Sequence, residues 1–147
     1  MNKAERLVMH VDDDRLITEI VRERLEQHGY RFVSVNDPSN IVDQLVHNNC
    51  RVVILDVQMP QANGLEVLSQ IKRYDGGVLV IMLTGLVSMT SVLESMRRGA
   101  EACLFKPLND VDPLLRALEA AFDKIDHWWM TLQDLTTRRH EDKLVSH

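Results

Sequence analysis

The sequence has no long hydrophobic run, few cysteines and no excess of positive charge, and these absences exclude several classes of protein. No segment approaches the roughly 20 apolar residues that a membrane-spanning helix needs. Residues 1–6 lack the apolar core of a signal peptide. The formal net charge of −5 argues against unaided binding to nucleic acid or to an anionic membrane. Cys50 and Cys103 both lie in apolar stretches, which predicts reduced, buried thiols in a cytoplasmic protein.

The composition is that of a soluble globular chain, with 45% hydrophobic and 27% charged residues. A length of 147 residues suits one domain with a short appendage. Short apolar stretches alternate with segments whose apolar residues recur at helical spacing. The predicted strands are 7–11, 30–35, 51–55, 78–83 and 102–105.

A helix is predicted after each strand, and the residues at several helix starts are typical of caps. Asp14 and Ser88 are candidate N-caps of the first and fourth helices. Asp112, followed by Pro113, has the same role in the fifth helix. The expected inward faces include Leu16, Ile17, Ile20, Val21 and Leu25 in the first helix and Val92, Leu93 and Met96 in the fourth.

The alternation predicts an α/β fold with five βα units and short connections. Apolar strands joined by amphipathic helices favour a parallel sheet with helices on both faces. Right-handed crossovers leave few topologies, and the flavodoxin-like strand order 2-1-3-4-5 suits this length.

One stretch organises the chain: four apolar residues from Val52 run directly into Asp56, and Pro60 follows. Asp56 therefore lies at the carboxyl end of a central buried strand, where open α/β sheets bind ligands. Polar side chains also follow the first, fourth and fifth strands. The complete set is Asp12, Asp13, Asp14, Asp56, Thr84 and Lys106.

These strand ends converge at one edge of a doubly wound sheet, which predicts a site that handles phosphoryl groups. Clustered carboxylates stay ionised together only when a cation joins them. Oxygen ligands suit Mg²⁺, which retains waters and binds phosphate oxygens. The ammonium of Lys106 and the hydroxyl of Thr84 can both donate to such an anion.

The chain resembles the receiver domain of bacterial two-component response regulators over roughly residues 5–125. The resemblance rests on short motifs that occur in the family's order and spacing. They are Val11-Asp12-Asp13, Leu55-Asp56 with Met59-Pro60 and Gly64, Met82-Leu83-Thr84-Gly85, Gly99-Ala100 and Lys106-Pro107.

The resemblance implies a phosphorelay function centred on Asp56. This carboxylate would accept a phosphoryl group from a phosphohistidine of a sensor histidine kinase or of a histidine phosphotransfer protein. Asp13, Asp56 and the backbone carbonyl of Gln58 would ligate Mg²⁺, and Asp12 would assist through water. The family is not a family of enzymes, although its members assist their own phosphorylation and dephosphorylation.

The resemblance also assigns the remaining strand ends. Thr84 and Lys106 would hold the phosphoryl oxygens, and the Lys106–Pro107 peptide would be cis. Asp14 is the odd member of the acidic triplet and is interpreted as a helix cap. Cys103 stands where the family often has an aromatic residue, which puts the usual coupling between the threonine and that aromatic in doubt.

The apolar pattern continues beyond the receiver domain, which is predicted to occupy residues 1–125. The fifth helix is expected to run on to about Arg138, and residues 126–147 form a helical extension with a polar tail that frays from Thr136. Trp128 and Trp129 then need a partner. The helix folds back on its own domain, or it pairs with a second copy or with another, unknown downstream protein. Our hypothesis is a homodimer through this helix, strengthened by phosphorylation that rearranges the fourth helix, fifth strand and fifth helix.

Two rival functions use the same residues differently. A phosphatase of the haloacid-dehalogenase type would place its nucleophile in residues 12–14, but Arg15-Leu16 does not resemble that family's Gly-Thr and the chain has no room for a cap domain. A receiver-shaped adaptor or dimerisation module would never be phosphorylated, and the complete acidic set argues against it.

Overall fold

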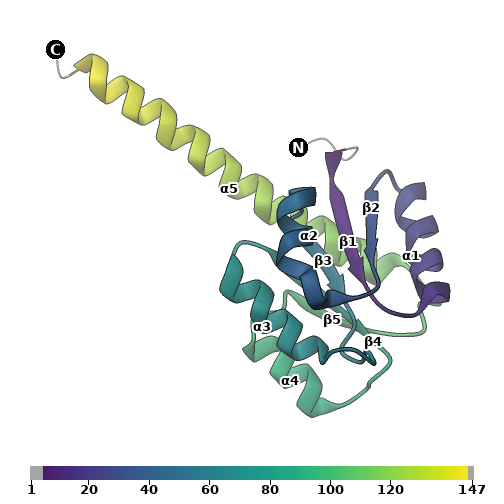
Figure 1. Ribbon diagram of the computed structural model, residues 1–147. Helices are drawn as coiled ribbons and strands as arrows, with labels where there is room; N and C mark the ends of the chain where they lie inside the picture. Colours follow the sequence, from purple (N-terminus) through teal and green to yellow (C-terminus); the bar gives the residue numbers. More distant parts are fainter. Residues whose placement is uncertain (1–4, 146–147) are drawn as a thin grey trace.

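The structure is a computed structural model that describes residues 5–145, and strands and helices alternate along it (Figure 1). The strands are β1 (Leu7–Val11), β2 (Arg31–Val35), β3 (Val52–Leu55), β4 (Leu79–Thr84) and β5 (Ala102–Phe105). The helices are α1 (Arg15–Gln27), the 3-10 turn η2 (Pro38–Asn40), α2 (Ile41–Asn48), α3 (Gly64–Tyr74), α4 (Met89–Arg97) and α5 (Asp112–Val145). Every predicted strand is present, with bounds that differ by at most one residue.

The strands form one parallel sheet in the order β2-β1-β3-β4-β5, which confirms the predicted topology. All four residues of β3 are buried, because this central strand has helices on both faces. β1 and β3 pair in the register Val11 with Leu55, so the residues that follow these two strands emerge side by side.

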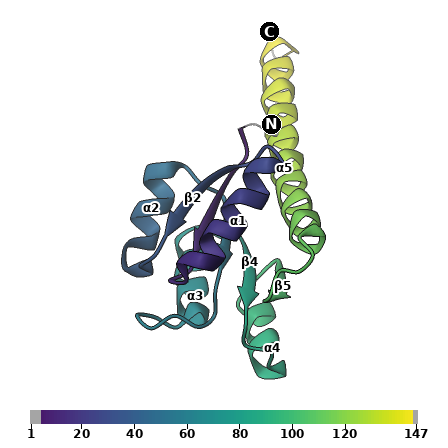
Figure 2. The same ribbon diagram turned by 90° about the vertical axis from the view of Figure 1, so that its right-hand side faces the viewer.

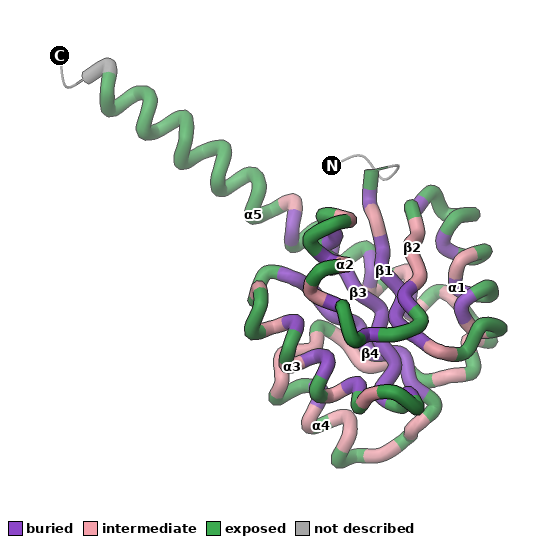
Figure 3. Tube along the Cα trace, in the orientation of Figure 1, coloured by how far each residue is buried: buried purple, intermediate pink, exposed green. Residues whose placement is uncertain are grey.

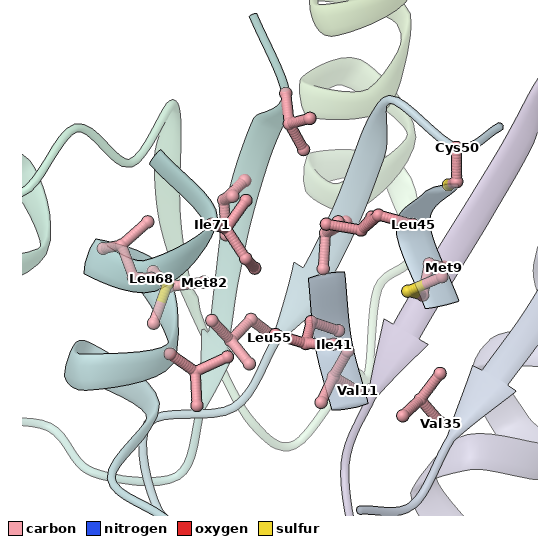
Figure 4. Close-up of a cluster of buried hydrophobic side chains, with 14 of the residues drawn as sticks. Met9, Val11, Val35, Ile41, Leu45, Cys50, Leu55, Leu68, Ile71 and Met82 are labelled. Carbon is pink, nitrogen blue, oxygen red and sulfur yellow. The ribbon is translucent and has the colours of Figure 1, made fainter. Parts of the chain in front are cut away.

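Two apolar clusters flank the sheet. On one face, Met9, Val11 and Leu55 pack against Ile41 of α2 and Leu68 of α3 (Figure 4). On the other face, the opposite side chains of the same strands pack against α1 and the first half of α5. Asp14 and Ser88 cap α1 and α4 as predicted, by accepting hydrogen bonds from backbone N–H groups of the first turn.

The predicted inward face of α4 is wrong for two of its three residues, since only Val92 is half-buried. Leu93 and Met96 are exposed, and the buried residue of this helix is Ser95, whose hydroxyl donates to the Ser91 carbonyl at 2.8 Å. The reason is position: α4 lies beside α3 and β5, and β5 is the last strand of the sheet. A helix at the edge covers less apolar surface than a helix over the centre. Leu16 and Ile20 of α1 are likewise exposed, against expectation.

The longest helix, α5, has two parts that differ in burial (Figure 3). Its first part covers the sheet through a buried set of residues: Leu114, Leu118, Ala121, Phe122 and Ile125. From His127 to Lys143 every residue is exposed, and the helix projects away from the domain (Figure 1, Figure 2). The helix therefore does not fold back on its own domain.

The predicted ends of α5 need correction. The helix continues past Arg138 to Val145, so the polar segment from Thr136 is helical as far as the structure describes it, and residues 146 and 147 lie outside the described range. No Gly or Pro interrupts this segment, and Arg138 pairs with Asp134 one turn earlier, which supports the helix. At its start, Asp112 is the first helical residue, and its N–H donates to the Asp110 side chain at 2.9 Å.

A cluster around Arg6 fixes the point where α5 leaves the domain. The Arg6 guanidinium bonds to Asp126 at 3.0 Å and lies 3.5 Å from Asp123. Its carbon is 5.2 Å from the centre of the Phe122 ring, and that ring stacks on Tyr30. These contacts tie the last buried turns of α5 to the start of β1.

Two further findings bear on the predictions from composition. Both cysteines are free, and Cys50 is buried as predicted, but Cys103 is only half-buried because it lies on the edge strand β5. No helix within residues 5–145 is both long enough and apolar enough to cross a membrane.

Candidate metal centre

Three carboxylates meet where β1 and β3 end. Asp12, Asp13 and Asp56 each offer an oxygen, and these oxygens lie within 4.8 Å of one another. The Asp56 N–H donates to the carbonyl of Val11 at 3.1 Å, which extends the β1–β3 pairing to the site. Asp12 and Asp56 are buried and Asp13 is half-buried. The predicted cluster therefore forms directly from the parallel register.

Lys106 neutralises part of this charge. Its Nζ lies 2.7 Å from Asp12 Oδ2 and 3.2 Å from Asp56 Oδ2. Burial disfavours the ammonium, but the hydrogen bonds and attraction of Asp12 and Asp56 outweigh it and raise the pKa of Lys106. The residue is therefore charged at neutral pH. The Lys106–Pro107 peptide is cis, as the resemblance implies.

Backbone N–H groups hold the other carboxylate oxygens. The N–H of Asp14 donates to Asp12 Oδ1 at 2.9 Å, and the N–H of Gln58 donates to Asp56 Oδ1 at 3.3 Å. Each of the two buried carboxylates is thus held at both oxygens, by the backbone on one side and by Lys106 on the other. This fixes their orientation before any ligand arrives.

Thr84 lies at the same edge of the sheet, at the end of β4, and is fully buried. Its hydroxyl accepts a hydrogen bond from the N–H of Leu86 at 3.0 Å. The N–H of Lys106 donates to the Thr84 carbonyl at 2.9 Å, so the two residues are joined through the backbone. The Thr84 hydroxyl is available as a donor, because the contact to Leu86 uses only an oxygen lone pair.

His10 is a buried neighbour of the cluster that the sequence predictions missed. Its Nε2 lies 3.9 Å from Asp12 Oδ2, and its ring packs 5.8 Å from Phe32. Burial lowers the pKa of His10 to about 4, against the opposing attraction of Asp12. The ring is neutral at pH 7 and adds no positive charge. A histidine two residues before Asp12, inside an apolar strand, is the signal that could have revealed it.

The cluster fits a divalent cation. One ammonium faces three carboxylates, which leaves a negative charge that the neutral His10 does not offset. The donors are hard oxygens, which favours Mg²⁺ over softer metals. Beside Asp13 an open groove of about 630 Å³ runs along the loop from Val57 to Asn63. Asp13 lines this groove, so the cluster is open to solvent on the side of this carboxylate.

The neutral His10 predicts a pH dependence of stability. Its pKa of about 4 in the folded protein lies below the usual 6.5, so the unfolded chain binds the proton more tightly between these values. The neutral His10 ring therefore makes its full contribution to the free energy of unfolding above pH 6.5, and this contribution is lost as the pH falls toward 4. We expect a loss of about 2 kcal/mol between pH 7 and pH 5 from this residue alone.

The measurement is urea unfolding at both pH values in EDTA, for the wild type and for His10→Leu. The variant lacks the titrating ring, so its loss of stability over this range should be smaller by that amount. Equal losses in the two proteins would show that His10 is not responsible.

Comparison with known proteins gives consistent matches. Residues 8–119 match the family model described as the response regulator receiver domain. The transcriptional regulatory protein CpxR of Escherichia coli K12 is 33% identical over 128 residues, which cover 87% of this chain and 52% of CpxR. The response regulator MprA of Mycobacterium sp. KMS is 32% identical over 113 residues, 76% of this chain and 49% of MprA. The chain spans about half the length of these curated relatives.

Solved structures agree with the sequence matches. A response regulator receiver domain protein from Clostridium thermocellum superposes with a TM-score of 0.77 at 25% identity, over 84% of this chain and 98% of that one. The response regulator TrrA from Thermotoga maritima, solved in complex with Mg²⁺ and BeF, gives a TM-score of 0.71 at 28% identity, over 79% of this chain and 98% of TrrA.

Proposed function

Because the chain belongs to the response regulator receiver domain family, we propose that it signals in a phosphorelay by accepting a phosphoryl group on Asp56. The observation that carries this proposal is the buried pair of Asp12 and Asp56, bridged by Lys106 beside the half-buried Asp13. The donor is a phosphohistidine of a sensor histidine kinase or of a histidine phosphotransfer protein.

The same residues would hold the metal on which this chemistry depends. Asp13, Asp56 and the backbone carbonyl of Gln58 would ligate Mg²⁺, and Asp12 would assist through water. When bound, the ion offsets charge on the phosphoryl oxygens and orients the group for transfer. The family fits this assignment, since the T. maritima relative was solved with Mg²⁺ and BeF.

Phosphoryl transfer to Asp56 requires only one bond to form and one to break. An oxygen of the Asp56 carboxylate attacks phosphorus, the P–N bond to the donor imidazole breaks, and that nitrogen keeps the electron pair. Lys106 already reaches the reacting carboxylate and can follow the charge to the phosphoryl oxygens. The Thr84 hydroxyl donates to one of these oxygens. Positioning and charge stabilisation supply the rate, as in phosphoryl transfer generally.

The rival functions have less support. In the phosphatase alternative the nucleophile lies in residues 12–14, but the Asp14 side chain is engaged as the N-cap of α1. The matched family is a receiver family and not a family of enzymes. The self-assisted phosphorylation and dephosphorylation of this chain are part of our proposal.

One experiment separates the three functions. The protein is incubated with Mg²⁺ and acetyl phosphate and then analysed by intact mass and peptide mapping. We expect one added phosphoryl group on the peptide that contains Asp56, stable in acid and labile in base. Sustained release of phosphate would favour the phosphatase, and absence of an adduct would favour the adaptor.

Metal binding gives a separate prediction. Mg²⁺ should bind weakly to the unmodified protein, because waters fill most of its coordination shell. Asp13→Ala should remove this binding, and Asp12→Ala should weaken it less. Chemical shifts of the Asp56 region report it. Asp14→Asn keeps the helix cap while removing a neighbouring charge, so it should bind nearly as the wild type does. Equal affinities for the wild type and Asp13→Ala would refute the ligand assignment.

Output is proposed to pass through the surface of α4, β5 and α5. Phosphorylation draws in Thr84 and Lys106, which end β4 and follow β5. Cys103 replaces the usual aromatic residue, so the change depends more on the loop at Leu86 and Val87. The readout is association of two copies through α5 and its extension, strengthened by phosphorylation.

The location of the protein and its contacts with nucleic acid or membrane can be proposed from its cysteines and its net charge. We propose a cytoplasmic protein, since its donor is a kinase or phosphotransfer protein and its two cysteines are free. The net charge of −5 argues against direct binding of residues 1–147 to nucleic acid or membrane. The relative CpxR, of which this chain covers 52%, is named as a transcriptional regulatory protein.

A further inference from the structure

The apolar face of α5 does not end where the domain ends. Leu118, Ala121 and Ile125 are buried against the sheet, and Trp128, Leu132 and Leu135 continue their spacing of three and four residues. We propose that this continuation, the projecting stripe, pairs with the same stripe of a second copy in antiparallel orientation. The inference rests on the association proposed above and adds its geometry.

The projecting segment needs a partner to be stable. From His127 to Lys143 every residue is exposed, so the domain covers little of these turns. A lone helix of this length is marginal in water. Trp128 and Trp129 are 62% and 51% exposed, which is unusual for the largest apolar side chains. A second helix along the stripe would cover them.

The position of the domain excludes a parallel pair. The residues that face the sheet and the residues of the projecting stripe share one helical spacing and so lie on one side of α5. The domain lies beside the first part of α5 only (Figure 2), so it occupies the side on which a partner helix must lie. In a parallel pair both domains would occupy the same space. In an antiparallel pair they sit at opposite ends, separated by the paired segments.

Charges along the stripe favour the same orientation. The heptad that contains Leu132 and Leu135 continues to Arg139 and Asp142. Parallel pairing would set Arg139 against Arg139 and Asp142 against Asp142. Antiparallel pairing sets Leu132 opposite Leu135 and places Arg139 over Trp128, a favourable cation–π contact. Residues 123–134 carry a net charge of −2 and residues 135–143 a net charge of +1, so opposite signs also meet.

The domain offers a place for the end of the second helix. At the base of the projecting segment a groove of about 250 Å³ is lined by Arg51, Asp75, Gly77, Ile125, Trp128, Trp129 and Leu132. In the antiparallel register Asp142 of the second copy lies level with Ile125, beside Arg51. Covering both pairs of tryptophans and the flanking leucines buries of the order of 1,000 Å², near the lower limit for a specific dimer.

Sedimentation equilibrium of the full chain tests the pairing. We expect a dimer whose dissociation constant rises at least tenfold in Leu135→Glu. Met130→Glu is the matched control: Met130 is 65% exposed but lies on the opposite side of the helix, so this variant should remain dimeric. Both residues are outside the domain core, and unchanged thermal unfolding of the domain verifies the fold. A monomeric wild type would overturn the proposal and leave the stripe to another protein.

Small-angle scattering of the dimer tests the orientation. An antiparallel pair gives a dumbbell, with two lobes separated by the paired helices of about 30 Å. A single compact lobe with a protruding rod would indicate domains at the same end and would overturn the antiparallel arrangement. Acetyl phosphate labelling is measured on the same samples, so loss of the phosphorelay function and loss of the dimer are distinguished.

Discussion

Replacement of Asp56 by asparagine is expected to abolish acyl-phosphate formation. The amide is nearly isosteric with the carboxylate, but it is a poor nucleophile and lacks the negative charge that pairs with Lys106. Labelling with acetyl phosphate and Mg²⁺, followed by intact mass, should show no phosphoryl adduct where the wild type is modified. The expected effect is complete, because Asp56 is the one acceptor that we propose, and the other two carboxylates, the buried Asp12 and the half-buried Asp13, are assigned to the metal.

A control is needed because the variant also removes a buried charge. Asp56→Asn relieves repulsion with Asp12 and Asp13, so its urea unfolding midpoint should equal or exceed that of the wild type. Asp75→Asn alters an exposed carboxylate that pairs with Arg51, far along the chain from the site, and should be labelled normally. A phosphoryl group of equal occupancy on folded Asp56→Asn would show that the acceptor is a different residue.

The second large effect is expected on stability, from Gly64→Ala. Gly64 begins α3, and its N–H donates to the carbonyl of Val57 at 2.8 Å. An added Cβ would overlap the carbonyl oxygen of Asp56 and lie 2.7 Å from the Cα of Val57. These atoms are backbone and cannot rotate away. We expect a loss of roughly 3 kcal/mol or more in the free energy of unfolding, the upper range for an overpacked site.

The same substitution should also slow phosphorylation, since relief of the overlap displaces the loop that carries Asp56 and Gln58. Urea unfolding and acetyl phosphate labelling measure the two effects. Gly76→Ala is the matched control, because nothing lies within 4 Å of a Cβ at that exposed glycine. Similar stabilities for the two alanine variants would mean that the close contact of the Gly64 position with the backbone of Asp56 and Val57 does not affect the free energy of unfolding.

The sheet and the acidic cluster could be predicted because each depends on local patterns. Apolar runs such as Val52–Leu55 identify buried parallel strands without further information. Once the strand order is known, the register brings Asp12 beside Asp56, and the backbone then positions the rest. The contacts of Lys106 with both carboxylates agree with the predicted set, whereas the roles of Gln58 and Thr84 toward metal and phosphate remain predictions.

Several predictions of burial were wrong for one reason. The spacing of apolar residues shows which face of a helix or strand is apolar, but it does not show how much of that face the rest of the domain covers. Leu93 and Met96 are spaced as inward residues, yet α4 sits at the edge of the sheet and leaves them exposed. The same limit applies to Cys103 on β5. The polar segment after Leu135 lacks an apolar signal for a helix, but nothing in it stops one. His10 escaped notice because burial of its ring depends on Phe32, which the pairing of β1 with β2 brings beside it.

The contacts of Arg6 with Phe122 and Asp126 hold α5 to the domain at one point, and the exposed part of the helix moves with any rotation at that point. The helix extends about 30 Å beyond Asp126, at 1.5 Å for each residue. A rotation of about 10° at the domain surface therefore displaces the tip sideways by roughly 5 Å, about half the distance between the axes of two packed helices. Adjustments in β5 and the start of α5 that are too small to alter the fold are thereby magnified into a sideways shift of the tip relative to a second helix.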